Sequence, residues 1–295
     1  MDTVDKKTNK NANKNRRGFM LNKQTIAFLG AGSMADAMIS GIVHAEKIPP
    51  QQIIVTNHSN QERLHELQKK YGVRGIKRDD LNIDEIDIFI LAMKPKDVDT
   101  ALNSMKKKLK PDQLILSVLA GISTSYLEKK LQEGQQIIRV MPNTSSMIGE
   151  SATAMSPSNS TGMDKVIAAK ELLQCIGEVY IIEEDKMDIF TGISGSGPAY
   201  FYYLMEHMEK VGKDEDLDAE MTRQIVAQTI LGAAKMIIEE EESPAKLREN
   251  VTSPNGTTAA GLEALEQYGG GKAISQAVKT AAKRSMEISS QLQEK

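Results

Sequence analysis

The chain has 295 residues, of which 40% are hydrophobic and 26% are charged, as in a globular protein with room for two domains. Its formal net charge of −3 gives no indication of a nucleic-acid partner. No apolar run approaches the ~20 residues that a helix needs to cross a bilayer, so we expect no membrane-spanning segment and no membrane partner.

Cysteine and histidine are sparse in this chain. Cys175 is the single cysteine, which excludes an intrachain disulfide and favours a reducing compartment, so we predict a cytoplasmic location. Cys175 lies in an apolar helical pattern that indicates a buried structural thiol. The four histidines have no metal-ligand spacing, so we expect no metal site. Residues 1–19 are rich in lysine and asparagine and lack an apolar core, which predicts a disordered extension.

From residue 20 to residue 183, short apolar runs alternate with helical patterns. The runs predict strands at 25–29, 52–56, 86–92, 113–119 and 136–140, and the helical patterns cover 34–45, 61–70, 96–109 and 125–131. Such alternation is typical of an α/β fold with a parallel, doubly wound sheet and helices on both faces. We therefore expect a Rossmann-type domain over residues 20–183.

A glycine-rich turn follows the first predicted strand. In GAGSMA (Gly30–Ala35), Gly30 provides the tight turn, Gly32 lets a pyrophosphate approach the backbone, and Ala35 allows close packing of helix on strand. A lone GxGxxA is a weak signal, but here it joins a strand to a helix within a βαβ unit, as dinucleotide binding requires. The turn residues predicted to bind the dinucleotide are Gly30, Gly32, Ser33 and Met34.

The residues after the second predicted strand bear on which dinucleotide binds. NAD specificity usually requires an acidic residue there, which holds the ribose 2′-hydroxyl. The chain instead reads Thr56-Asn57-His58-Ser59-Asn60, with no carboxylate before Glu62 and with Arg63 nearby. Polar donors and an arginine suit a 2′-phosphate, so we predict that NADPH is preferred and NADH is possible. The predicted contacts come from Asn57, His58, Ser59 and Arg63.

After residue 183 the strand patterns stop, and helical patterns cover 198–211, 218–241, 258–267 and 272–292. Residues 184–295 are thus predicted to form an all-helical domain. The 218–241 helix carries two adjacent apolar rows, which make a face wider than a one-sided surface helix needs: Met221, Ile225, Thr229, Ala233 and Ile237, beside Val226, Ile230 and Ala234. We expect this face to be buried in an oligomer; the alternative is the centre of a monomeric helix bundle.

The segment Val251–Glu266 (VTSPNGTTAAGLEALE) combines a Ser-Pro turn, Asn255-Gly256 and two threonines that open an apolar helix. Such a helix start presents unpaired backbone N–H groups and the positive end of the helix dipole at one point. We expect that point to bind a small carboxylate. A nucleotide site in one domain and a small-anion site in the other indicate a redox enzyme acting on a small acid.

Motifs in both predicted domains match one family. The first domain contains GAGSMADAMISG (Gly30–Gly41), LAMKP (Leu91–Pro95), LAGIS (Leu119–Ser123) and RVMPNT (Arg139–Thr144). The second contains TGISGSGPAY (Thr191–Tyr200), QTILGAAKM (Gln228–Met236) and VTSPNGTTAAGL (Val251–Leu262). Many Rossmann dehydrogenases share the first turn, but the other motifs in this order are specific. From residue 23 to about residue 292 the chain resembles the pyrroline-5-carboxylate reductases.

The resemblance implies an oxidoreductase that transfers a hydride from NAD(P)H to the C=N bond of 1-pyrroline-5-carboxylate, which gives L-proline as the last step of proline biosynthesis. It implies that Lys94, Pro95, Ala120 and Gly121 line the cofactor cleft. It also implies that backbone N–H groups of one loop bind the substrate carboxylate, and that the Thr258 hydroxyl, the candidate catalytic group, hydrogen-bonds the ring nitrogen. The implied substrate-binding residues are Glu241, Ser253, Pro254, Asn255, Gly256, Thr257 and Thr258.

The resemblance to this family also implies a homo-oligomeric assembly. Helical domains of this family interlock into dimers, which often assemble further into rings, and the active site is then shared between subunits. This agrees with the wide apolar face of the 218–241 helix.

Four positions depart from the usual family pattern. Asn255 stands where the family has glycine, and asparagine tolerates left-handed backbone. Ser145 replaces a proline, Ser151 replaces a glycine, and Asp79 lies where an asparagine commonly contacts the adenosine ribose. These changes bear on cofactor and substrate affinity and leave the reaction class unchanged.

Two other functions are compatible with the pattern. One is a β-hydroxyacid dehydrogenase, which would use a helix-borne lysine, and Lys235 is the candidate for it. The other is a non-catalytic paralogue that keeps the fold for binding NADP. The Thr258 hydroxyl has a purely structural alternative too, in which it satisfies a backbone group in the first turn of its helix.

Overall fold

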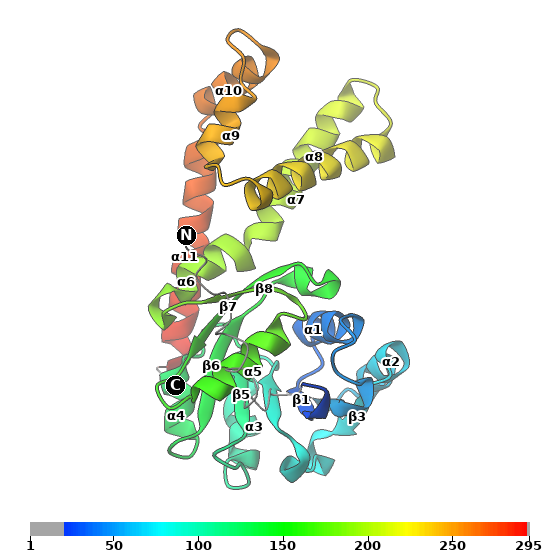
Figure 1. Ribbon diagram of the computed structural model, residues 1–295, viewed down its shortest axis with the longest axis vertical. Helices are drawn as coiled ribbons and strands as arrows, with labels where there is room; N and C mark the ends of the chain where they lie inside the picture. Colours follow the sequence, from blue (N-terminus) through cyan, green and yellow to red (C-terminus); the bar gives the residue numbers. More distant parts are fainter. Residues whose placement is uncertain (1–20, 294–295) are drawn as a thin grey trace, which may run out of the picture.

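The computed structural model describes residues 21–293, so the extension predicted over residues 1–19 lies outside the described residues. Figure 1 shows two parts, a sheet flanked by helices and a group of long helices that stands above it. The last strand of the sheet ends at Ile181, and we propose the domain boundary between residues 183 and 184.

The sheet has eight strands in the order β3-β2-β1-β4-β5-β6-β7-β8. Their bounds are β1 Ile26–Leu29, β2 Ile53–Asn57, β3 Arg74–Lys77, β4 Ile88–Leu91, β5 Leu114–Ser117, β6 Gln136–Met141, β7 Ser151–Pro157 and β8 Gly177–Ile181. The central strands β1, β4 and β5 are buried along their whole length, because helices cover both faces. The five predicted strands are thus all confirmed, with ends shifted by one or two residues.

The sheet is parallel as predicted except at one pair, because β6 and β7 are antiparallel. Only a short turned segment separates these two strands, and a parallel pair would need a longer crossover. Three strands carry no pronounced apolar run and were not predicted. These are β3 (RGIK), β7 (SATAMSP) and the largely exposed β8 (GEVYI).

Two apolar clusters lie on opposite faces of the sheet. One contains side chains of α1 (Ser33–His44), α2 (Gln61–Tyr71) and α5 (Met163–Leu173). The other contains side chains of α3 (Val98–Met105) and α4 (Thr124–Lys130). The sulfur of Cys175 belongs to the first cluster, and burial raises the pKa of this thiol although Lys47 acts against the shift. The predicted role of Cys175 as a buried structural thiol fits this position.

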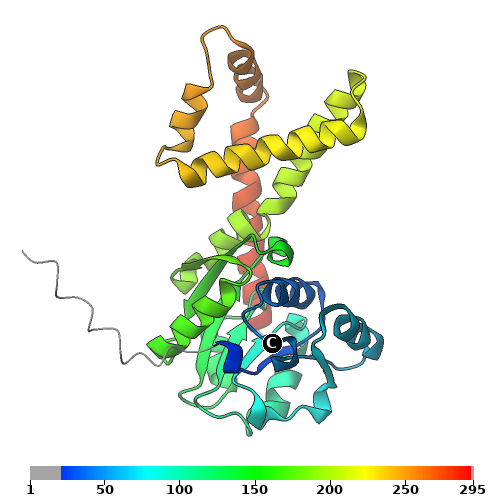
Figure 2. The same ribbon diagram turned by 45° about the vertical axis from the view of Figure 1, so that its right-hand side comes forward.

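The second part of the chain is all-helical, as predicted. It consists of α6 Met187–Phe190, a π-helical turn at Thr191–Gly195, α7 Gly197–Asp214, α8 Ala219–Glu239, α9 Pro244–Asn250, α10 Thr257–Gln267 and α11 Gly270–Gln293. The short helices α6 and α9 were not predicted. Figures 1 and 2 show α11 descending from the far end of the helical part to the sheet.

Buried and partly buried polar contacts join the two parts. The Asn143 side chain, after β6, donates from Nδ2 to the carbonyl oxygen of Ser194 at 3.3 Å and to its Oγ at 3.2 Å. Ser194 lies in the π-helical turn and donates from Oγ to the Ala152 carbonyl at 2.8 Å. Arg139 of β6 forms an ion pair with Glu184 at 3.3 Å. The orientation of the helical part is therefore held by directional bonds to the sheet.

The wide apolar face of α8 is exposed within the single chain. α8 packs against α7, where Gly212 lies so close that an added Cβ would be 2.6 Å from Thr222 Cγ2. In α8 only Thr222 and Val226 are buried, whereas Ile225 is 52% exposed. α7 exposes Phe201, Tyr202 and Tyr203 by more than half. A monomeric helix bundle would bury these side chains, so that alternative does not describe the structure.

Replacing Asn143 tests the polar connection between the two parts. Asn143→Ala should lower the free energy of unfolding by about 1–3 kcal/mol, because the buried Ser194 groups lose their donor. The measurement is urea unfolding at a fixed protein concentration, since an oligomer's stability depends on concentration. Asn103→Ala, at an exposed position of α3, is the matched control and should stay within about 0.5 kcal/mol of the parent. Equal unfolding midpoints for both variants would contradict the proposed connection.

Candidate active site

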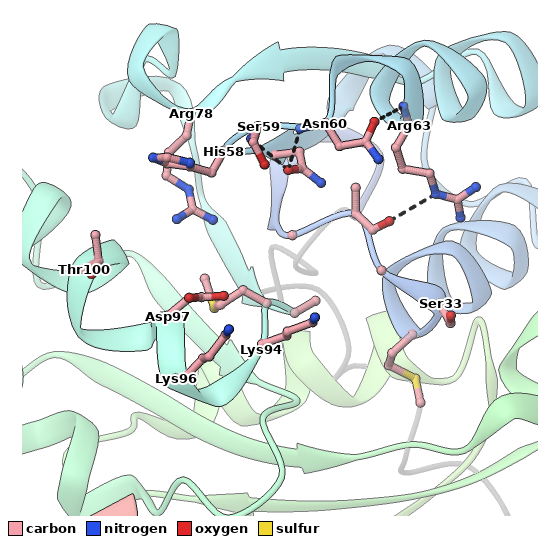
Figure 3. A pocket seen from close by; sticks show the side chains of 17 residues that line it. Ser33, His58, Ser59, Asn60, Arg63, Arg78, Lys94, Lys96, Asp97 and Thr100 are labelled. Carbon is pink, nitrogen blue, oxygen red and sulfur yellow. Dashed lines mark hydrogen bonds between the residues drawn. The ribbon is translucent and has the colours of Figure 1, made fainter. Parts of the chain in front are cut away.

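A cavity of about 1140 Å³ opens at the carboxyl ends of β1, β2 and β4 (Figure 3). In the strand order β3-β2-β1-β4, the chain runs outward from β1 to β3 and then crosses back to β4. The connections leave β1 and β4 in opposite directions, and such a switch point is where open α/β sheets bind their ligands. The predicted cofactor residues that line the cavity are Gly30, Gly32, Ser33, Met34, Asn57, His58, Ser59, Arg63 and Lys94.

The glycine turn has the geometry that a pyrophosphate site requires. Gly30 has a φ of +128°, and a Cβ added there would lie 2.4 Å from the Ala92 carbonyl oxygen, so a larger residue is excluded. A Cβ added to Gly32 would meet nothing within 4 Å. Gly32 caps α1 without a side-chain hydrogen bond, so the first N–H groups of α1 face open space. A phosphate anion fits this helix start.

Arg63 lies in the cavity wall with its guanidinium held by three acceptors. Nε donates to the Ala31 carbonyl at 3.1 Å, Nη1 to Glu66 at 2.9 Å, and Nη2 to Asp36 at 2.5 Å. Burial raises the pKa of the Asp36 carboxyl, but hydrogen bonds from Tyr71 and Arg63 outweigh burial and leave that pKa below its usual value. Arg63 therefore ties α2 to the glycine turn, whatever further contact it makes with a ligand.

The sequence analysis missed five polar residues of the cavity: Asn60, Arg78, Lys96, Asp97 and Thr100. Arg78 follows β3, one of the three strands that were not predicted, and the β2–β3 register brings it beside His58 (Figure 3). Lys96, Asp97 and Thr100 follow β4 on the other side of the cavity. The signal that could have found them is the position directly after a strand of a parallel sheet.

Three predicted cofactor residues do not line this cavity: Pro95, Ala120 and Gly121. Pro95 begins the 3-10 turn after Lys94. Gly121 has a φ of +79° and lies against α11, where an added Cβ would be 3.0 Å from Ile288 Cγ2. Ala120 beside it is exposed. Contact of these three residues with a cofactor stays a prediction.

The predicted substrate loop ends at the start of α10. Gly256 is the N-cap residue of this helix and has no side chain that could cap it. Within the described residues, the hydroxyl groups of Thr257 and Thr258 have no hydrogen-bond partner. The structural role for the Thr258 hydroxyl, satisfaction of a nearby backbone group, is thus not seen. Asn255 has a φ of +59°, the left-handed conformation expected from its replacement of glycine.

Within one chain, the substrate loop and the cavity lie apart. Both Figure 1 and Figure 2 place the α9–α10 connection at the end of the molecule opposite the sheet, which carries the cavity. Glu241 lies in the exposed connection between α8 and α9, and not in a helix as predicted. Ser253, Pro254 and Asn255 are exposed too. The structure therefore does not bring the predicted substrate residues to the cofactor residues of the same chain.

Residues 21–293 contain neither a side-chain group that could hold a metal ion nor a helix that could span a membrane. In that part of the chain, His, Cys, Asp and Glu side chains form no group of three or more that could hold a metal ion. Its helices also include none with the length and apolar character needed to span a bilayer.

Comparison with known proteins identifies the family. Residues 184–288 match the model described as pyrroline-5-carboxylate reductase dimerisation, and residues 25–121 match the model described as NADP oxidoreductase coenzyme F420-dependent. Pyrroline-5-carboxylate reductase 1 of Bacillus subtilis is 59% identical over 274 residues, which cover 93% of this chain and 92% of the relative. Pyrroline-5-carboxylate reductase 2 of the same organism is 44% identical over 90% of this chain and 95% of the relative.

Solved structures agree with this match. The pyrroline carboxylate reductase of Plasmodium falciparum with NADP bound has a TM-score of 0.83 at 27% identity, covering 91% of this chain and 99% of that one. A pyrroline-5-carboxylate reductase from Coxiella burnetii has a TM-score of 0.81 at 30% identity, with the same coverage of both chains. The matched dimerisation region contains the exposed faces of α7 and α8, so the chain self-associates. The chain belongs to the pyrroline-5-carboxylate reductase family.

Proposed function

We propose that this chain reduces the C=N bond of 1-pyrroline-5-carboxylate with NAD(P)H to give L-proline. The observation that carries the proposal is the helix start at Gly256–Thr258, which offers unpaired N–H groups and an unpartnered hydroxyl to a small cyclic acid. The 59% identity to a reductase named for this substrate supports it. No observation favours the β-hydroxyacid dehydrogenase, since Lys235 is exposed on α8 and distant in sequence from the cavity residues.

The cavity residues fit the cofactor. The first N–H groups of α1 would hold the pyrophosphate, and Lys94 on the opposite wall contributes positive charge. When bound, NADPH supplies the hydride that reduces the imine carbon. The protein supplies position, because the substrate loop fixes the carboxylate and thereby the ring.

Thr258 acts on the ring nitrogen in this proposal. Its hydroxyl hydrogen-bonds the ring nitrogen, and it donates to that nitrogen as hydride addition gives the nitrogen a lone pair and amine character. The imine can bind already protonated, so a strongly acidic side chain beside it is not required. Glu241, in the exposed α8–α9 connection, contributes a carboxylate near the same site by family resemblance.

The proposed active site is shared between two chains. One chain's loop lies at the end of the molecule opposite the sheet, and its α7 and α8 expose apolar faces within the matched dimerisation region. Pairing through these helices would carry the loop of one chain toward the sheet of its partner. We further propose that dimers assemble into rings and that the enzyme works in the cytoplasm, in line with its single buried thiol.

The reaction itself is tested by following NADPH absorbance with 1-pyrroline-5-carboxylate as the acceptor. We expect turnover with this acceptor and none with a 3-hydroxy acid and NAD. Binding of NADPH without turnover of any cyclic imine would instead identify a non-catalytic protein and reject the proposal.

Removal of the Thr258 hydroxyl tests its catalytic role. Thr258→Ala should lower kcat by about 100-fold or more, because a hydrogen bond to the reacting nitrogen is lost, while NADPH binding is unchanged. Thr252→Ala is the matched control from the same segment, since the Thr252 hydroxyl already donates to the Arg248 carbonyl at 2.6 Å. The control should keep the parent kcat. A kcat for Thr258→Ala equal to that of the control would remove Thr258 from the mechanism.

Mixed dimers test whether the site is shared. Gly32→Asp places a carboxylate where the pyrophosphate would bind, in space that accepts a Cβ, and Thr258→Ala disables the loop. Each variant alone should be nearly inactive. Co-expressed at equal levels, they should recover about a quarter of the parent activity, because half of the dimers have one intact site of two. Mixed dimers that are verified by native mass spectrometry and yet inactive would show that cavity and loop act within one chain.

A further inference from the structure

The wall of the cofactor cavity contains four long cationic side chains, which differ in how their charge is balanced. They are Arg63, Arg78, Lys94 and Lys96. Arg63 is already paired with Asp36 and Glu66. Lys94 and Lys96 are exposed at the other side of the cavity, after β4. Arg78 remains as a partly buried cation on the wall formed by β2 and β3.

Arg78 has no partner among residues 21–293. Its guanidinium takes part in no hydrogen bond and no ion pair with that part of the chain, and its Nε is buried without an acceptor. Burial lowers the pKa of the Arg78 side chain, and the carboxylates of Asp97 and Asp79 act against that shift from beyond ion-pair distance. A partly desolvated guanidinium without an acceptor is costly, so an anion bound here would stabilise it.

The position of Arg78 relative to β2 indicates which anion. Asn57 of β2 pairs with Lys77 of β3, so the next residues, His58 and Arg78, lie side by side at the carboxyl edge of the sheet. Figure 3 shows both side chains at the same wall of the cavity. In a βαβ dinucleotide site, the ribose 2′ position lies beside the end of the second strand. A 2′-phosphate at that place would find the guanidinium within its reach.

The loop after β2 is preformed for such a contact. The Asn57 side chain accepts from the backbone N–H groups of Ser59 at 3.1 Å and Asn60 at 3.2 Å, which fixes the turn. The loop contains no carboxylate before Glu62. Arginine binds phosphate oxygens through two parallel N–H donors and stays charged at any pH at which the protein is folded.

We propose that Arg78, supported by His58, recognises the 2′-phosphate of NADPH and sets the preference for NADPH over NADH. The inference deepens the proposed function, because it assigns the specificity of the same site. Arg63, the arginine chosen from the sequence, holds the glycine turn to α2 instead.

Binding of cofactor fragments tests the assignment without turnover. The probes are 2′,5′-ADP, which carries the 2′-phosphate, and 5′-AMP, which lacks it, each titrated calorimetrically into the full-length protein. Arg78→Gln should weaken 2′,5′-ADP binding by about 10- to 100-fold, the loss expected for a charge-assisted hydrogen-bonded pair, and leave 5′-AMP binding within about twofold. Arg78→Lys keeps the positive charge but loses the two parallel N–H donors of the guanidinium, so it should give an intermediate affinity.

The matched control is Arg74→Gln, at the start of β3 and outside the cavity, where Arg74 pairs with Glu85 at 3.2 Å. It should leave both affinities unchanged. In the reductase assay, Arg78→Gln should lower kcat/KM with NADPH by the same factor as the fragment affinity and leave kcat/KM with NADH unaffected.

Equal losses for the two fragments, or an unchanged affinity for 2′,5′-ADP, would overturn the assignment. Thermal melting shows whether the Arg78→Gln variant is folded. If that variant is unfolded, the Arg78→Lys variant provides the same comparison of 2′,5′-ADP binding with 5′-AMP binding. Failure of the proposed reaction would appear separately, as absent turnover in the parent chain with the fragment affinities intact.

Discussion

The helical half of the chain exposes more apolar surface than a stable monomer tolerates, and the location of the proposed active site depends on how that surface is covered. Ile225 and Phe201 are each 52% exposed on two long helices that pack on one another. Contiguous apolar faces of this kind mark association surfaces. Because α7 and α8 belong to the matched dimerisation region, we infer that a second copy covers them. Folding, assembly and formation of the proposed site are thus linked through the same two helices.

The connection between the two parts must be stiff for such an arrangement to position a small substrate. A loop at the far end of a helical domain amplifies any rotation at its base into a displacement at its tip. The bonds of Asn143 to Ser194, which are buried, and of Arg139 to Glu184, which are partly buried, lie at that base. α11 adds a second connection, since its last turns pack against Gly121 in the sheet domain. Directional bonds and a returning helix together restrict rotation that a single linker would allow.

The sequence predicted those features that depend on local patterns. Strands β1, β4 and β5 are continuous apolar runs, and the starts of α1 and α10 follow from glycine turns and helix capping. Strands β3 and β8 lie at the edges of the sheet, where few apolar residues are needed, so their sequences carry no strong signal. The antiparallel β6–β7 pair and the separation of loop from cavity are tertiary features. Arg78 was missed because its proximity to His58 arises from β2–β3 pairing across twenty residues of sequence.

The two arginines of the cavity show why residue type and proximity in sequence are weak guides to ligand recognition. Arg63 lies six residues after Asn57, close to the expected 2′ position, yet Asp36, Glu66 and the Ala31 carbonyl occupy its donors. Its hydrogen bonds already stabilise the fold, because they hold the turn that is predicted to bind pyrophosphate. Arg78 has no such acceptors, so the free energy of its interaction with a phosphate is available on binding. A charge left unbalanced inside a preformed cavity is therefore a better indicator of ligand contact than a charge near a motif.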